Sequence, residues 1–61
     1  MLTPDLADFE AKLARYTTAE QVREADEGRA LLDRLGIYAY PAEHRQACAR
    51  RLAEVTRATR R

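Results

Sequence analysis

The chain lacks most of the residues that stabilise a very small domain by other means than packing. Its 61 residues include one cysteine, two glycines, two prolines and no tryptophan. A single cysteine excludes an intrachain disulfide, and without an array of cysteines and histidines the sequence predicts no zinc site and no cofactor. No apolar run is long enough for a leader or a membrane span, so we expect a cytoplasmic protein without a membrane association.

Large apolar side chains are also few. The hydrophobic residues make up 46% of the chain, but 12 of these 28 residues are alanines, which bury little area. A chain of this length buries only about 60% of the surface that its unfolded form exposes. The sequence therefore predicts a single domain over residues 1–61 that gains stability from a second copy, and we expect a homo-oligomer, for which a homodimer is the simplest form.

The first of three predicted helices lies near residues 3–16. Thr3 can cap it, and Pro4 suits the first turn because its missing N–H would be unpaired there anyway. Apolar residues then recur at helical spacing on one stripe, which consists of Leu2, Leu6, Phe9, Leu13 and Tyr16. This stripe exceeds what the second helix can cover, so the predicted oligomerisation surface consists of Leu6, Phe9, Leu13 and Tyr16.

A second helix is predicted near residues 18–35. Thr17 and Thr18 each have a Glu or Gln three residues later, which is the pattern of a capping box, and Gly36 follows as the residue that ends the helix. Gly28 costs about 1 kcal/mol relative to alanine in mid-helix; it either permits close backbone contact or marks a kink. The expected inner face is thin and consists of Gln21, Ala25, Gly28, Leu32 and Leu35.

A third helix is predicted near residues 41–59, after an ordered connector at residues 37–40. Pro41 disfavours helical dihedrals in the residue before it and suits the first turn of a new helix. One apolar stripe follows, which places Cys48 in the core as a small residue and His44 at the edge of the core. The predicted fold class is all-α, a small three-helix bundle.

Charge is divided unevenly along the chain. Residues 1–33 hold eight acids and four bases, a net of −4, whereas residues 34–61 hold seven bases and two acids, a net of +5. The basic third helix can meet phosphate or an acidic protein surface. Alternatively, the two halves complement each other within the bundle or across a dimer. In the second helix, Asp26 and Arg29 belong to a series of alternating charges that is expected to be a solvated, paired face.

The predicted partner surface joins the connector to the basic face of the third helix. Tyrosine is an amphipathic anchor that is enriched at interfaces, and charges beside it add selectivity. The residues assigned to this surface are Tyr38, Tyr40, Arg50, Arg57 and Arg61. We therefore expect a small non-catalytic regulatory or accessory protein that binds a protein partner through helix faces. Ten arginines against one lysine indicate a GC-rich bacterial or phage source.

Nucleic-acid binding is the alternative function. The segment from Leu31 to Ile37, followed by a further helix, resembles the first half of a helix-turn-helix motif. In that arrangement the basic third helix and the arginine tail would contact DNA or RNA. Glu43 and Glu54 interrupt the arginine stripe, however, and a net charge of +1 is low for binding that depends on phosphate contacts.

No residue pattern predicts an enzyme or a small-molecule substrate. His44 and Cys48 are one helical turn apart, but structural zinc needs four ligands and catalytic zinc needs three. A Cys–His dyad on one helix face also lacks an oxyanion hole and a pocket that excludes water. The sequence contains no phosphate loop and no dinucleotide fingerprint.

Overall fold

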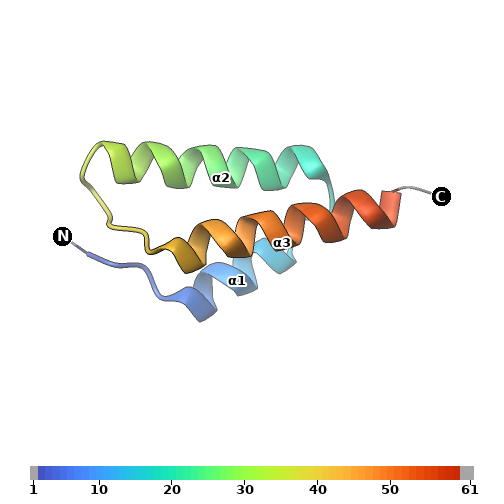
Figure 1. Ribbon diagram of the computed structural model, residues 1–61, viewed down its shortest axis with the longest axis horizontal. Helices are drawn as coiled ribbons and strands as arrows, with labels where there is room; N and C mark the ends of the chain where they lie inside the picture. Colours follow the sequence, from blue (N-terminus) through green and yellow to red (C-terminus); the bar gives the residue numbers. More distant parts are fainter. Residues whose placement is uncertain (1, 60–61) are drawn as a thin grey trace.

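The computed structural model describes residues 2–59, in which three helices follow one another: α1 (Leu6–Ala14), α2 (Ala19–Arg34) and α3 (Ala42–Thr59). α3 packs against both of the other helices, whereas α1 and α2 contact each other only weakly (Figure 1). The described residues contain no strand, only one isolated parallel bridge between Leu2 and Tyr38. The predicted small all-α fold is therefore confirmed for this part of the chain.

α1 begins later than its sequence predicts, and Thr3 is not its cap. The N-cap is Asp5, whose carboxylate accepts a hydrogen bond from the backbone N–H of Asp8 at 3.1 Å. The residues before it are held away from the helix: the Leu2 carbonyl accepts from the Ala39 N–H at 2.9 Å. Because this segment pairs with the connector, its backbone stays extended and the first turn moves towards the C-terminus.

α2 begins and ends with the predicted local motifs. Thr18 and Gln21 form a complete capping box, in which each side chain satisfies the backbone N–H of the other. At the other end, Gly36 has a φ of 76°, and the N–H groups of Gly36 and Ile37 reach back to the carbonyls of Asp33 and Leu32. This pair of hydrogen bonds is a Schellman motif, which needs the left-handed conformation that glycine adopts without strain.

The inner face of α2 differs from the predicted face. Val22 is 1% exposed, whereas Leu35 is 61% exposed. The Gln21 side chain is drawn back to the N-terminus by the capping box, where it also accepts from the Thr17 N–H at 3.0 Å. The helix is therefore rotated so that Val22, rather than Gln21 and Leu35, faces the interior of the bundle.

α2 and α3 run antiparallel beside each other, joined by the connector (Figure 1). The first turn of α2 lies beside the last turn of α3, where Ala19 and Arg23 share a depression with Thr56 and Thr59. In a helix-turn-helix the two helices cross at about 90–120° instead. The segment from Leu31 to Ile37 therefore resembles that motif in sequence, but the two helices around it are not arranged as in a helix-turn-helix.

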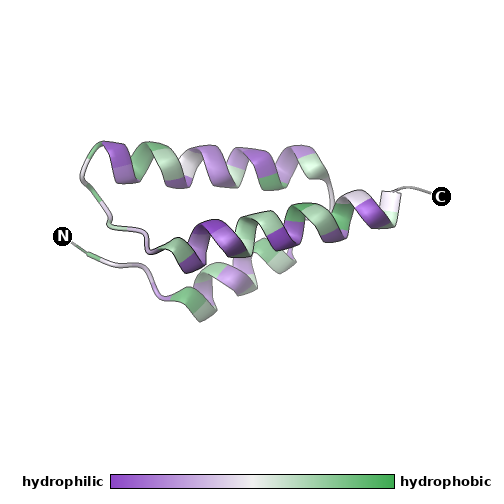
Figure 2. Ribbon diagram, viewed as in Figure 1, coloured by the Kyte–Doolittle hydropathy of each residue, from purple (hydrophilic) through white to green (hydrophobic). Residues whose placement is uncertain are grey.

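The core is small and centred on α3. Cys48 is buried, as predicted, and forms a cluster with Leu13 and Ala47, against which Phe9, Tyr16 and Ala25 pack. Hydrophobic residues also occur outside this cluster, including in the part of α2 that leads into the connector (Figure 2). The large aliphatic side chains exposed there and beside it are Leu2, Leu31, Leu35 and Ile37.

Candidate functional site

A groove of about 550 Å³ lies between α1 and α2, where these two helices contact each other only weakly. We call it the aromatic groove. Asp5 and Asp8 lie at the start of α1, and Gly28 lies on the α2 side. The side chains that give the groove its character are Phe9, Lys12, Arg29, Leu32, Tyr38 and Tyr40. It therefore combines an apolar, aromatic lining with a small number of charged groups.

The aromatic rings at this end pack against one another. The Tyr40 ring lies 6.0 Å from Phe9, 6.1 Å from Tyr38 and 5.3 Å from His44, measured between ring centroids. Tilted and edge-on arrangements at such distances are favourable for aromatic pairs. Both connector tyrosines are thus half-buried and line the same groove, so neither lies flat on the outside of the protein.

His44 fixes the base of this aromatic cluster. Only 2% of the residue is exposed, which places it inside the core and not at its edge as predicted. Its Nε2 lies 3.0 Å from the Pro4 carbonyl oxygen, while Nδ1 has no hydrogen-bond partner among the described residues. The sequence pattern could not show this burial, because it depends on the extended segment before α1 crossing the start of α3.

Arg29 brings a positive charge into the aromatic groove. Its side chain is 11% exposed, and its Nε donates to the Asp26 carboxylate at 2.8 Å. Its guanidinium also lies within hydrogen-bond reach of the Cys48 thiol, and its terminal nitrogens donate no hydrogen bond to an oxygen of residues 2–59. The two charges are paired as predicted and Asp26 is 44% exposed, but Arg29 is mostly buried, which corrects the expectation of a solvated face for this residue.

Two groups beside Arg29 titrate unusually. Burial raises the pKa of Tyr40, and the neighbouring Tyr38 raises it further. Burial, and after it the nearby Asp26 carboxylate, raise the pKa of Cys48 from 9.0 to about 11. A buried thiol that stays protonated is a poor nucleophile, so its geometry favours the packing role predicted for it.

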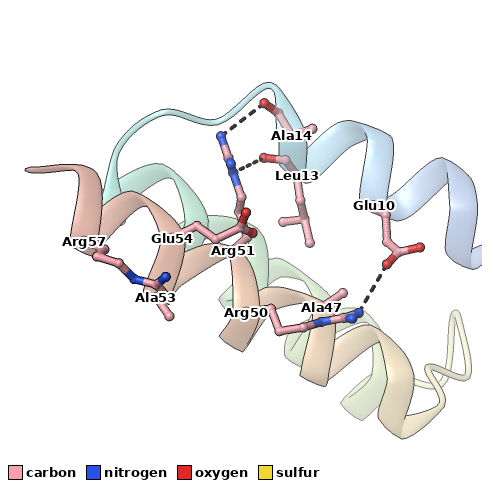
Figure 3. Close-up of a pocket in the computed structure, with 9 residues that line it drawn as sticks. All are labelled: Glu10, Leu13, Ala14, Ala47, Arg50, Arg51, Ala53, Glu54 and Arg57. Carbon is pink, nitrogen blue, oxygen red and sulfur yellow. Dashed lines mark hydrogen bonds and ion pairs between the residues drawn. The ribbon is translucent and has the colours of Figure 1, made fainter.

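A second depression lies on the other side of α1, between α1 and the C-terminal half of α3. It has a volume of about 510 Å³, and we call it the arginine cleft. Figure 3 shows Arg50 reaching across it to Glu10, with which it forms an ion pair at 3.2 Å. Arg57 lies further along the same helix, beside Ala53 and Glu54. Glu10 and Glu54 thus offset part of the positive charge of the cleft.

Arg51 has a structural role that the sequence analysis did not identify. Its guanidinium donates to the carbonyl oxygens of Leu13 and Ala14 (Figure 3). It also donates to the carbonyl oxygen of Tyr16, which is the shortest of these contacts at 2.7 Å. These carbonyls are at the end of α1, where helix carbonyls lack partners and a positive charge is favourable. No signal in the sequence distinguishes Arg51 from its neighbour Arg50, because the contact joins segments 35 to 38 residues apart.

The predicted partner surface is divided in the structure. Tyr38 and Tyr40 line the aromatic groove, whereas Arg50 and Arg57 line the arginine cleft on the other side of α1. Arg61 lies outside the described residues. The two predicted groups are therefore not one continuous site, because α1 lies between them.

The predicted oligomerisation stripe is largely used within the chain. Leu13 is 3% exposed, and Phe9 and Tyr16 pack against the cluster that it forms with α3. Leu6 is half-buried at the start of α1. Oligomerisation stays a prediction, but Leu13 offers almost no surface to a second copy.

Within residues 2–59 no three side chains of the kinds that ligate metals are grouped together, and none of the helices there is long and apolar enough to cross a membrane. No protein-family model, curated protein or solved structure matches this chain. Inferences about its function therefore rest on its own residues and their geometry.

Proposed function

We propose that the protein is a small, non-catalytic binding module that receives a helix of a protein partner in the aromatic groove. The observation that carries this proposal is an open groove between two weakly contacting helices, lined by Phe9, Tyr38 and Tyr40. Along this groove the chain from the N-cap Asp5 to Lys12 in α1 spans about two helical turns, or about 12 Å. A groove of this kind suits an amphipathic helix with anchors at helical spacing.

The charges of the groove define the partner's chemistry. Arg29 lines the groove with a largely buried guanidinium whose terminal nitrogens donate to no oxygen of residues 2–59, a geometry that suits a carboxylate. The partner helix accordingly carries apolar residues on one face and an Asp or Glu that reaches Arg29. Its apolar face covers the tyrosine rings, which contribute most of the affinity in interfaces of this type.

Selection from a phage-displayed library of peptides of about 14 residues, three to four helical turns, tests this proposal. Selected sequences are expected to share apolar positions spaced three and four apart and one acidic position. Tyr38→Ala should weaken their binding by more than about 1 kcal/mol, or roughly fivefold or more. If nothing is enriched above an unrelated protein, or if Tyr38→Ala binds as well as the wild type, the proposal fails.

A pair of arginine variants tests the acidic position. Selection on Arg29→Gln should lose the preference for Asp or Glu, whereas selection on Arg23→Gln, at an exposed position of the same helix, should keep it. Circular dichroism first establishes that both variants are folded.

Nucleic-acid binding remains the alternative, with less support. Arg50 and Arg51 are both engaged in contacts with α1. Titration with a random-sequence DNA duplex distinguishes the two functions, since affinity from phosphate contacts falls log-linearly with salt. We expect no binding above about 100 mM salt, where an apolar helix contact would persist.

A further inference from the structure

The outer face of α2 leads to a second proposal: we propose that α2 pairs with α2 of a second copy, antiparallel, around a two-fold axis at Leu31. Leu31 and Leu35 are one turn apart on this face and are 44% and 61% exposed. Val22, on the opposite side of the helix, is 1% exposed and therefore faces the interior of the bundle. The two leucines are therefore turned away from the bundle.

The exposed leucines continue into a larger apolar surface. Ile37 follows them in the connector and is 51% exposed, and Leu2, which is bridged to the connector at Tyr38, is 71% exposed. These residues belong to the end of α2, to the connector and to the segment bridged to the connector. Exposed aliphatic groups of this extent on a small chain mark an interaction surface.

The order of residues on this face makes it complementary to itself. Glu27 and Arg34 lie on one flank of Leu31, four residues before it and three after it. In an antiparallel pair with a two-fold axis, equal flanks face each other and positions equally far before and after the centre meet. Glu27 of one copy and Arg34 of the other are then offset by one residue, about 1.5 Å along the helices, which these long side chains can span to form two ion pairs.

The other flank carries Gly28 and Leu35, three residues before Leu31 and four after it. A Cβ added at Gly28 would have no neighbour within 4 Å, so packing within the chain does not require glycine in the middle of α2. In the proposed dimer, Leu35 of one copy packs over Gly28 of the other. The pairing thus accounts for a glycine that otherwise weakens the helix.

Charge favours a second copy over another kind of partner. Next to Leu31 the contact face holds one acid and one base, so its centre is neutral and matches its own two-fold image, while Glu24, two turns before Leu31 on the same face, lies beyond the end of the other copy's α2. A strongly acidic or basic partner would meet a like charge on this face. The contact leaves the connector tyrosines of each copy lining the aromatic groove, but Gly28 belongs to both surfaces, so the second copy covers one edge of the groove.

Sedimentation equilibrium between about 1 µM and 1 mM tests the proposal, because a single helix pair makes a small interface with modest affinity. The wild type is expected to shift from monomer to dimer within this range. Leu31→Glu should weaken dimerisation by at least about 100-fold, since it removes two central leucines. Ala49→Glu, an exposed position on α3, is the matched control and should dimerise as the wild type does.

A charge-reversal cycle tests the register. Glu27→Arg and Arg34→Glu should each weaken the dimer about tenfold by replacing two attractive pairs with two repulsive ones, and the double variant should recover most of the affinity. A wild type that stays monomeric at about 1 mM, or a dimer that Leu31→Glu leaves intact, overturns the proposal. Single reversals that weaken the dimer without recovery in the double variant overturn the proposed register.

Discussion

The α1–α3 contact and the connector end of this protein use apolar side chains in opposite ways. At the α1–α3 contact, Leu13 is 3% exposed and packs with small residues of α3, while Arg51 binds the carbonyl oxygens at the end of α1. At the connector end, Leu35 and Leu2 are 61% and 71% exposed. One region satisfies its apolar and polar groups within the chain, and the other leaves apolar groups in solvent.

This difference separates the part that holds the fold from the parts available for binding. A chain of 61 residues has few large side chains, and those at the connector end contribute little to its own core. The same end carries the half-buried tyrosines of the aromatic groove. We therefore expect substitutions at the α1–α3 contact to act on stability, and substitutions at the connector end to act on association.

The largest expected effect is that of Leu13→Ala. Removing this buried side chain should lower the free energy of unfolding by about 2–5 kcal/mol, which is enough to unfold much of so small a domain. Leu35→Ala is the control and should cost less than about 0.5 kcal/mol, because its side chain is mostly exposed. Urea denaturation followed by circular dichroism measures both. Equal losses in the two variants would abolish the distinction between the regions.

Alkaline pH should weaken the α1–α3 contact through Cys48. The pKa of its thiol is raised from 9.0 to about 11 in the folded protein, so folding favours the protonated form. The resulting stability is fully present below pH 9 and is lost as the pH rises towards 11, a difference on the order of 2 kcal/mol. The wild type should lose this much more stability than Cys48→Ala between about pH 8 and pH 11. Equal losses would show that the thiol is not the group responsible.

Arg51 and Arg50 are neighbours in the sequence, and comparing their variants separates a structural contact from a surface ion pair. Arg51→Ala removes several charge-assisted hydrogen bonds to the end of α1 and should cost about 1–3 kcal/mol. Arg50→Ala removes only an exposed ion pair with Glu10 and should cost less than about 1 kcal/mol. Thermal unfolding of both variants gives the order of the two effects. The reverse order would mean that the capping contacts contribute little to stability.

The smallest effect concerns α2 and has the opposite sign. Gly28→Ala should stabilise the monomer by up to about 1 kcal/mol, because alanine is the better helix former and its Cβ has space. Unfolding at about 5 µM, where association is weak, measures this gain. A loss of stability would show that the folded chain needs glycine at this position.

The helices could be predicted from the sequence because their signals are local. The capping box at Thr18 and the helix end at Gly36 each depend on residues a few positions apart, and both occur as predicted. The predicted start of α1 was wrong because Leu2 pairs with the connector, more than 30 residues away in the sequence. The spacing of apolar residues likewise does not indicate which face of α2 is buried, because each of its faces holds few apolar residues.

The candidate site could be predicted only in part, for the same reason. Tyr38 and Tyr40 were identified as interface residues from their chemistry, and the structure places both in one groove. Their separation from Arg50 by α1, and the burial of Arg29, depend on how the helices pack against one another. The exposed apolar surface did have a signal in the sequence, which is the pair of leucines four residues apart at Leu31 and Leu35. This pair could be interpreted only once the structure showed that Val22, on the opposite side of α2, is the buried residue.

The central claim is that the exposed leucines of α2 do not hold the fold. The most direct test is urea denaturation of the double variant Leu31→Ser/Leu35→Ser at about 5 µM, a concentration at which a weak dimer contributes little. We predict a cooperative transition whose free energy of unfolding lies within about 1 kcal/mol of the wild type. A loss of the cooperative transition, or a decrease as large as that of Leu13→Ala, would contradict the account.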